Sequence, residues 1–407
     1  MINTFNLLFL AMVFFAEAKG AIYKSERSFN SSDELLYSQW IQKSLTSDIF
    51  SNPESPYYGI KTDCADAAFA LRAIYAFENK LSFEFIDNEG RKITENLTNF
   101  DSGSDVERLK KLIEYISENA GSEMLAGHNT YPIELKSIRP GDLYITKWKN
   151  SSGGESRHVY IIKDILPTGD LLLFSSTQPR AIRPLLARKG MPLHFFSEMP
   201  FGFRRFYSSN ERKIMNLENY SLEQYELMLT GEKKFFSEVK LKLKNDEDTL
   251  QNNFDRRIEN VCVALTARKD VVDLALKEKM KLGKKCFDEK RYDEFSTPSR
   301  DQNIIKDIER LRNGYRFALE NSRQNELSEE THLGMSYLIG INKSKESLES
   351  LKQMCSLEIQ LNESQQVIVN IKSFYDRSQA KLISSNPNES RLARWGYEKE
   401  SKACKRK

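Results

Sequence analysis

The sequence predicts an N-terminal α+β domain that is followed by an all-α helical domain. Strand-like alternation of apolar and polar residues is concentrated between residues 141 and 207, with helical periods before it. Beyond about Ser208 the strand signals vanish, the charge rises and helical periods dominate. A chain of 407 residues is long enough for two domains. We therefore expect domains at residues 19–207 and 208–407, after a short targeting segment.

The first eighteen residues have the pattern of a secretory signal peptide. Residues 7–16 form an apolar core that is too short to cross a bilayer. Ala16 and Ala18 are small residues at the positions that a signal peptidase reads, so we expect the mature chain to begin at Lys19. No later stretch resembles a transmembrane helix. The pattern predicts export to the periplasm or the extracellular space, and the alternative is an uncleaved anchor or a buried N-terminal helix.

The charge is nearly balanced, with 61 Lys and Arg residues against 58 Asp and Glu residues. The basic residues are interleaved with acids and form no stripe with aromatic residues, so nucleic acid binding is not predicted. His128, His194 and His332 are scattered without the spacing of metal ligands, so no metal site and no cofactor is predicted.

The cysteines are distributed unevenly. Cys64 is alone in the first half, and the second half holds Cys262, Cys286, Cys355 and Cys404. In an exported protein, an even set in one domain predicts two disulfides, for which three connectivities are possible. Cys64 then remains as a free thiol. The alternative is that the four cysteines are reduced and partly buried.

Helices are expected on both sides of the strand region. Residues 31–50 carry one apolar face, and a second helix begins at Cys64 with Asp63 as its N-cap. The segment 80–137 has the character of an insertion, with a short strand at 81–86, an exposed helix near residues 106–113 and an irregular stretch at 121–132. Further on, apolar stripes begin at Ile258 and at Leu348.

Four strands follow from the period-two pattern. They are expected near residues 143–146, 157–165, 171–176 and 202–207. In the second of these strands His158, Tyr160 and Ile162 share one face, whereas Val159 and Ile161 share the other.

Four short motifs in the first half carry the chemistry. They are Pro56-Tyr57-Tyr58-Gly59, Asp63-Cys64-Ala65-Asp66, Arg139-Pro140-Gly141-Asp142-Leu143 and His158-Val159-Tyr160-Ile161-Ile162. The positive end of a helix dipole and a nearby imidazolium both lower the pKa of a thiol. Cys64 at a helix start and His158 on a strand against that helix therefore predict a Cys-His pair that performs acyl transfer on amides.

Two further roles, orienting the imidazole and stabilising the oxyanion, are assigned to residues near this pair. A polar group on the following strand is expected to orient the imidazole, and the candidates are Ser175, Ser176, Thr177 and Gln178. The backbone N–H of Cys64 is expected to point toward a developing oxyanion, with Tyr57 or Tyr58 as a second donor.

The order and the residues of these motifs resemble those of the NlpC-type cell-wall cysteine peptidases. These are papain-like enzymes that cut peptide bonds in bacterial peptidoglycan stems. The matching positions are Pro56, Tyr57, Gly59, Asp63, Cys64, Pro140, Gly141, Asp142, Leu143, His158 and Val159. The resemblance covers roughly residues 55–180. It implies a papain-like N-terminal domain, with Cys64 as the nucleophile, His158 as the base and Tyr57 or Tyr58 as an oxyanion helper. Ser175 aligns with the third catalytic position.

Three functions stay open at this point. The first is a cysteine peptidase or amidase that acts on peptides, above all on peptidoglycan stem peptides. The second is a catalytically disabled papain-like fold that binds a partner through its helical domain, which Ala65-Asp66 and the serine at position 175 favour. The third is an acyl transferase, because residues 68–73 with Arg72 also resemble transglutaminase-like folds. The partner of the helical domain is not identified by any motif.

Overall fold

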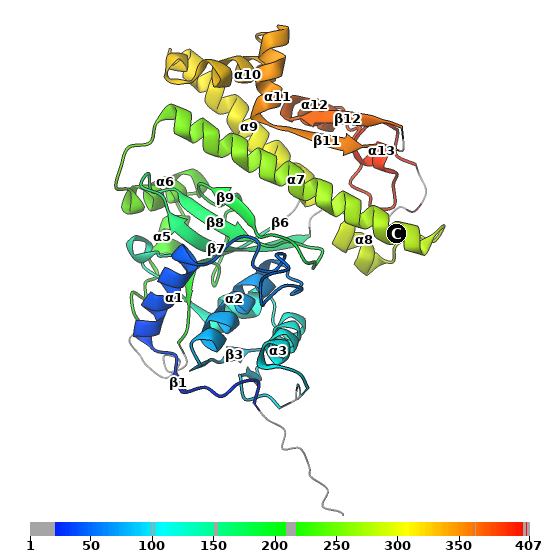
Figure 1. Cartoon of the computed structure of the whole chain (residues 1–407). Helices are drawn as coiled ribbons and strands as arrows, with labels where there is room; N and C mark the ends of the chain where they lie inside the picture. Colours follow the sequence, from blue (N-terminus) through cyan, green and yellow to red (C-terminus); the bar gives the residue numbers. More distant parts are fainter. Residues whose placement is uncertain are drawn as a thin grey trace, which may run out of the picture.

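The structure is a computed structural model, which Figure 1 shows as a cartoon. It describes residues 21–98, 100, 102–149, 154–208, 217–362, 364–401 and 404. The signal peptide predicted at residues 1–18 lies outside these described residues and stays a prediction. Among the described helices, none has both the length and the apolar character that a membrane crossing requires.

A six-stranded antiparallel sheet forms the centre of the first half. Its strands are β5 (Thr130–Pro132), β6 (Leu143–Lys149), β7 (Glu155–Ile165), β8 (Leu171–Ser175), β9 (Leu186–Lys189) and β10 (Gly202–Phe206). Their order in space is β5-β10-β6-β7-β8-β9. The four predicted strands are confirmed as β6, β7, β8 and β10. The additional strands β5 and β9 have only three and four residues, which is too short for a period of two to stand out.

Helices cover both faces of this sheet (Figure 1). On one side are α1 (Ser31–Lys43) and α2 (Cys64–Glu78), and on the other is α6 (Glu232–Leu243). The ring of Phe69 on α2 lies 6.3 Å from that of Phe206 on β10. The ring of Phe235 on α6 lies 6.3 Å from that of Phe203. Because side chains alternate along β10, these contacts place α2 and α6 on opposite faces.

The segment between α2 and β6 is built from short elements. Two short strand pairs come first: β2 (Leu81–Ser82) pairs with β1 (Arg27–Ser28), and β3 (Phe85–Ile86) pairs with β4 (Lys92–Ile93). The helical elements are α3 (Asp105–Asn119), α4 (Ser122–Met124), a π-helical turn (Leu125–Asn129) and a 3-10 turn (Leu135–Ser137). The single strand expected at 81–86 is thus two short ones. The expectation of an exposed helix is wrong for one side of α3, because its apolar stripe is buried in the main core.

The core of the first half continues beyond residue 207. Aromatic side chains of α5 (Glu223–Met228) and α6 join it, whereas a separate second core begins at Phe254. Phe236 lies 6.0 Å from Tyr144 of β6, ring centre to ring centre. The sheet-bearing part therefore extends to Leu243, because α6 is needed to cover one face of the sheet.

The second half is mostly helical. Its elements are α7 (Leu250–Leu282), α8 (Glu289–Phe295), α9 (Pro298–Glu320), a 3-10 turn (Gln324–Glu326), α10 (Glu329–Ile339), α11 (Lys345–Met354), α12 (Ile371–Gln379) and α13 (Arg391–Arg394). It also contains an antiparallel hairpin of β11 (Ser356–Gln360) and β12 (Gln366–Asn370). The prediction of an all-α domain is wrong at this hairpin, whose inward side chains Ile359 and Val369 pack into the second core.

Side chains of the helical half hold the outer edge of the sheet. The N–H of Lys189 on β9 donates to Asn260 Oδ1 on α7 at 2.9 Å, and Asn260 Nδ2 donates to the carbonyl of Lys189 at 2.7 Å. Next to it, Arg188 donates two hydrogen bonds to Asp307 of α9, at 2.9 and 3.1 Å. These contacts fix α7 and α9 against β9.

Two disulfides lie in the second half, as the cysteine distribution predicts. They join Cys262 to Cys355 and Cys286 to Cys404, which selects one of the three possible connectivities. Cys64 is a free, partly exposed thiol.

Candidate active site

A cavity of about 530 Å³ lies between the sheet and the helical half. One part of its wall comes from the start of α2 and the start of β7, and another part from α7 and α9. Its lining includes Cys64, Asp66, His158, Tyr160, Ser175, Thr177, His194, Asn260, Arg300, Asn303 and Asp307. Because β8 ends at Ser175, the first residues of β7 extend beyond it and form part of the wall.

Cys64 is the first residue of α2, and local interactions explain why the helix begins there. Asp63 Oδ1 accepts hydrogen bonds from the N–H groups of Ala65 and Asp66, at 3.1 and 3.3 Å. Asp66 closes the capping box by accepting the N–H of Asp63 at 2.9 Å. The N–H of Cys64 is the remaining donor in this turn, and it is the one that the sequence assigns to an oxyanion.

The environment of the Cys64 thiol favours its protonated form. Burial raises the pKa of the thiol, and the carboxylate of Asp63 raises it further. The backbone of Val159 lowers the pKa in part. The thiol is therefore neutral at pH 7. The influence of Val159 also indicates that the sulfur lies close to β7, one residue beyond His158.

Asp66 lies two residues from the thiol but is paired. It is 2% exposed and accepts a hydrogen bond from Arg180 Nε at 2.8 Å. The guanidinium offsets part of the charge of this carboxylate, and Asp66 still raises the pKa of the Cys64 thiol. Ala65-Asp66 therefore has a structural role, as part of the helix cap and of an ion pair with the loop after β8.

His158 also lines the cavity and is uncharged at neutral pH. Its ring packs edge-on against that of Tyr160, with ring centroids 4.5 Å apart. Burial lowers the pKa of His158 to about 4, and the nearby Arg300 guanidinium lowers it further. Arg300 comes from α9 and donates to Thr177 Oγ1 at 2.8 Å. The helical half thus adds, through Arg300, to the effect of burial on the imidazole.

The thiol and the imidazole approach the cavity from different sides of β7. His158 shares a face with Tyr160, whose cross-strand partner Tyr144 packs on α6. Cys64 begins α2, which covers the other face. The strand of His158 lies against α2, as the Cys-His prediction requires, and the alternation along β7 turns the imidazole to the opposite face. The two groups share one cavity because it surrounds the free edge of β7.

Ser175 is the residue predicted for the third position of the catalytic triad. Ser175 lines the cavity, and continuing the pairing of Ile161 with Phe174 by one residue places it opposite Tyr160. Thr177, two residues further on, also lines the cavity. On the other side of β7, the buried Thr146 pairs directly with His158. The Thr146 hydroxyl has no hydrogen-bond partner among the described residues, so the direct pairing does not make it an orienting group for the imidazole.

The two tyrosines predicted as oxyanion donors are not in the cavity lining. The Tyr57 hydroxyl donates to Glu78 Oε1 at 2.9 Å. Glu78 is the last residue of α2, which places this hydroxyl about 20 Å from Cys64 along the helix axis. Tyr58 is 42% exposed at the surface. The motif that suggested an oxyanion role instead anchors the loop before α2 to the C-terminal end of that helix.

A second histidine in the cavity was not assigned a role from the sequence. His194 stacks on Trp148, with ring planes 5° apart and centroids 3.6 Å apart. Burial lowers the pKa of His194 to about 3, with further contributions from Lys306 and His158. No spacing signal joins His194 to Cys64 or His158 in the sequence. Only the packing of the β9–β10 connection against β6 brings this ring to the site.

Replacing Arg300 with glutamine is expected to raise the pKa of His158. The Arg300 charge disfavours the imidazolium, so its removal shifts the titration of the imidazole from about 4 toward the ordinary value of 6.5. The measurement is a histidine-selective NMR titration between pH 3 and 8, with His332 as the internal reference. Arg316→Gln, an exposed position on the same helix, is the matched control. An unchanged His158 titration in the Arg300 variant would contradict the assigned contact.

No protein-family model matches this chain, and the searches of curated proteins and of solved structures found no match. The site is described by its geometry: a capped helix start with a neutral thiol, a neutral imidazole on the adjoining strand and a cavity wall to which α7 and α9 contribute.

Proposed function

We propose that this protein is a thiol hydrolase that cleaves amide bonds, with Cys64 as the nucleophile and His158 as the base. The observation that carries the proposal is that Cys64, at the start of α2, and His158, on β7, line one cavity. A thiol and an imidazole at a shared cavity, with a backbone donor beside the sulfur, are the groups that acyl transfer needs. The order of the motifs, which resembles NlpC-type peptidases, points the same way.

The reaction begins from a neutral pair. The sulfur attacks the carbonyl carbon while the S–H proton passes to the imidazole of His158, directly or through one water. The carbonyl oxygen becomes an oxyanion next to the N–H of Cys64. The C–N bond then breaks as the imidazolium returns the proton to the leaving amine. Water hydrolyses the thioester with His158 again as the base, which releases the acid and restores the thiol.

The proposed substrate is a peptide, and by the resemblance a peptidoglycan stem peptide. The cavity has the volume of a small-ligand site, which suits a few residues of an extended peptide. The helical half then forms the far wall of the binding site through Arg300 and Asn303. We also propose export, which the two disulfides support because such bonds persist in oxidising compartments.

The test is digestion of purified muropeptides by the wild-type protein and by Cys64→Ser. We expect the wild type to release shorter stem peptides and Cys64→Ser to release none, because serine is a far weaker nucleophile at this position. His158→Ala should also lose the activity. Thermal unfolding of each variant verifies that it is folded. Equal digestion by wild type and Cys64→Ser would remove Cys64 from the mechanism.

A second candidate function is a secreted binding protein on the same fold. It is favoured by the charge states of the pair, because the pKa of the thiol is raised and that of the imidazole is lowered. Muropeptide binding by the wild type with no product, and with the same affinity in Cys64→Ser, would support it over hydrolysis.

A further inference from the structure

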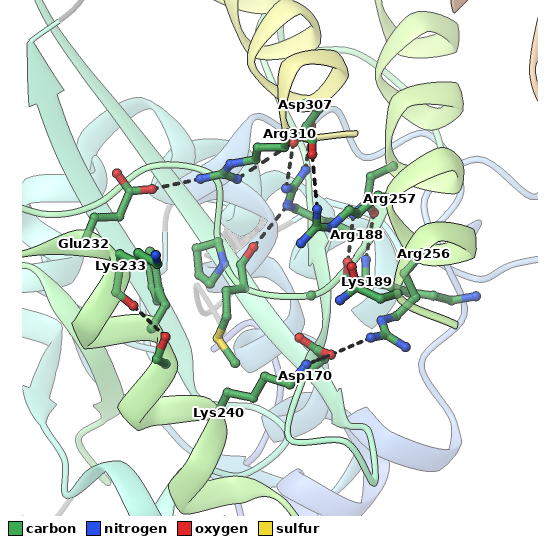
Figure 2. Close-up of a pocket in the computed structure, with 17 residues that line it drawn as sticks. Asp170, Arg188, Lys189, Glu232, Lys233, Lys240, Arg256, Arg257, Asp307 and Arg310 are labelled. Atoms are coloured by element: carbon green, nitrogen blue, oxygen red, sulfur yellow. Dashed lines mark hydrogen bonds and ion pairs between the residues drawn. The ribbon is translucent and has the colours of Figure 1, made fainter. Parts of the chain in front are cut away.

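A second cavity, of about 500 Å³, lies on the other side of the contacts that hold β9 to the helical half. Figure 2 shows that α6, the end of β9, α7 and α9 surround it. Of the ten ionisable side chains in its lining, seven are basic and three are acidic. Two carboxylates outside the lining also pair with the wall: Asp248 with Lys240 and Arg256, and Glu259 with Lys189. With these included, the excess is seven basic against five acidic groups, or +2. Such an excess of one sign in a concave site attracts ligands of the opposite sign.

The acidic groups of this wall are already shared between basic partners. Asp170 accepts hydrogen bonds from Lys240 Nζ at 2.7 Å and from Arg256 Nη2 at 2.8 Å. Glu232 is bound by Arg310 Nη2 at 2.8 Å. Asp307 carries both hydrogen bonds from Arg188. Each of the three carboxylates is thus already paired with at least one basic side chain of the wall.

Two basic residues of the wall have no carboxylate partner among the described residues. Arg257 donates only to the backbone carbonyl of Arg310, at 3.2 Å. Burial lowers the pKa of Arg257, and so do the charges of Arg310 and Arg256. The charges of Asp170 and Asp248 raise this pKa in part. Lys233 makes no ion pair with a described carboxylate and is exposed at the rim of the cavity. A clustered, partly desolvated guanidinium of this kind costs stability unless an anion joins it.

We propose that this cavity binds a small molecule that carries a phosphate or diphosphate group, with Arg257 and Lys233 as its principal ligands. A guanidinium presents paired N–H donors that match phosphate oxygens, and an excess of basic groups favours a multiply charged anion over a single carboxylate. The volume is that of a small-ligand site. The site is distinct from the Cys64 cavity, although Arg188, Asn260 and Asp307 contribute to both walls.

The test uses inorganic pyrophosphate and the full chain, with isothermal titration calorimetry at 50 and 150 mM NaCl. We expect saturable binding with one site per chain, weakened at least tenfold in Arg257→Gln because a charge-assisted hydrogen bond is lost. Arg316→Gln, the same substitution at an exposed position of α9, should bind as the wild type does. Citrate is the second probe, and weaker binding than pyrophosphate is expected.

Three outcomes would overturn the proposal: no saturable binding to the wild type, an unchanged affinity in Arg257→Gln, or citrate bound as tightly as pyrophosphate. If Arg257→Gln lowers the midpoint of thermal unfolding, Lys233→Gln provides the decisive comparison, since that exposed side chain makes no described ion pair. Digestion of muropeptides is not part of this test, so the proposal stands or falls independently of the hydrolase function.

Discussion

Replacing Arg72 with methionine is expected to lower the free energy of unfolding by about 3–5 kcal/mol. Arg72 lies in the middle of α2 and is 2% exposed, and its partner Glu34 on α1 is 4% exposed. Arg72 Nη1 donates to Glu34 Oε2 at 2.9 Å, and Nη2 donates to the other carboxylate oxygen. Its guanidinium also lies 3.6 Å from the ring centre of Phe29. Without Arg72, the buried carboxylate of Glu34 loses both of these hydrogen bonds and the positive charge that offsets its burial.

Urea unfolding of the wild type and of Arg72→Met measures this effect. The double variant Arg72→Met/Glu34→Met is expected to recover much of the loss, because an apolar pair of similar volume replaces a buried ion pair at little cost. Lys80→Met is the exposed control. Its partner Glu26 is 63% exposed, so the change should stay within about 1 kcal/mol. A loss no larger in Arg72→Met than in Lys80→Met would show that the α1–α2 ion pair adds little stability.

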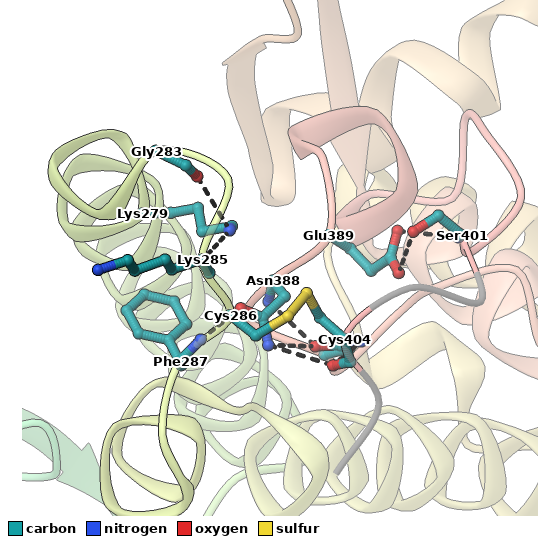
Figure 3. Close-up of a disulfide and its surroundings, with 10 residues drawn as sticks. Lys279, Gly283, Lys285, Cys286, Phe287, Asn388, Glu389, Ser401 and Cys404 are labelled. Atoms are coloured by element: carbon teal, nitrogen blue, oxygen red, sulfur yellow. Dashed lines mark hydrogen bonds between the residues drawn. A yellow bond between two sulfur atoms is a disulfide. The ribbon is translucent and has the colours of Figure 1, made fainter.

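Removing the disulfide between Cys286 and Cys404 by a double serine substitution is expected to cost about 4–5 kcal/mol. The bond closes a loop of 118 residues, so its loss releases a large conformational entropy in the unfolded chain. Figure 3 shows that the bond joins the segment after α7 to the C-terminal segment. Asn388 supports the same contact, because it accepts the N–H of Phe287 at 2.9 Å and donates to the carbonyl of Cys404 at 3.2 Å.

The effect should fall on the helical half, where Phe287, next to Cys286, belongs to a small cluster with Ala275 and Phe295. A chain with separate cores need not unfold in one step, so the measurement is the thermal midpoint of each transition, recorded by calorimetry. Cys64→Ser is the matched control, since it replaces a free thiol and should change neither midpoint by more than a few degrees. Equal midpoints for the wild type and the Cys286→Ser/Cys404→Ser variant would contradict the entropic account of this bond.

Local signals in the sequence account for much of the fold. The N-cap at Asp63 places the start of α2 correctly, and period-two alternation finds β6, β7, β8 and β10. β9 is missed because four residues carry little periodicity. The attachment of α6 to the sheet is missed because it depends on tertiary contacts between aromatic side chains and not on a local pattern.

The sequence predicts which residues form the candidate pair better than it predicts how these residues are arranged in space. Motif order identifies Cys64 and His158, and both line the same cavity. Alternation shows that His158 and Val159 point to opposite faces, but only the assembled layers show that α2 covers the face of Val159. Arg300 is 142 positions from His158 in the sequence. Its influence on the imidazole could not be inferred without the packing of α9 on the sheet.

The side-chain amide of Asn260 affects whether the sheets of two copies of this protein can pair edge to edge. β9 ends the sheet, and an open edge strand is a template onto which a strand of another molecule can add. Asn260 occupies both the donor and the acceptor of Lys189, as a neighbouring strand would, and α7 lies over the rest of that edge. By covering β9, the helical half therefore also hinders aggregation through strand pairing at this edge.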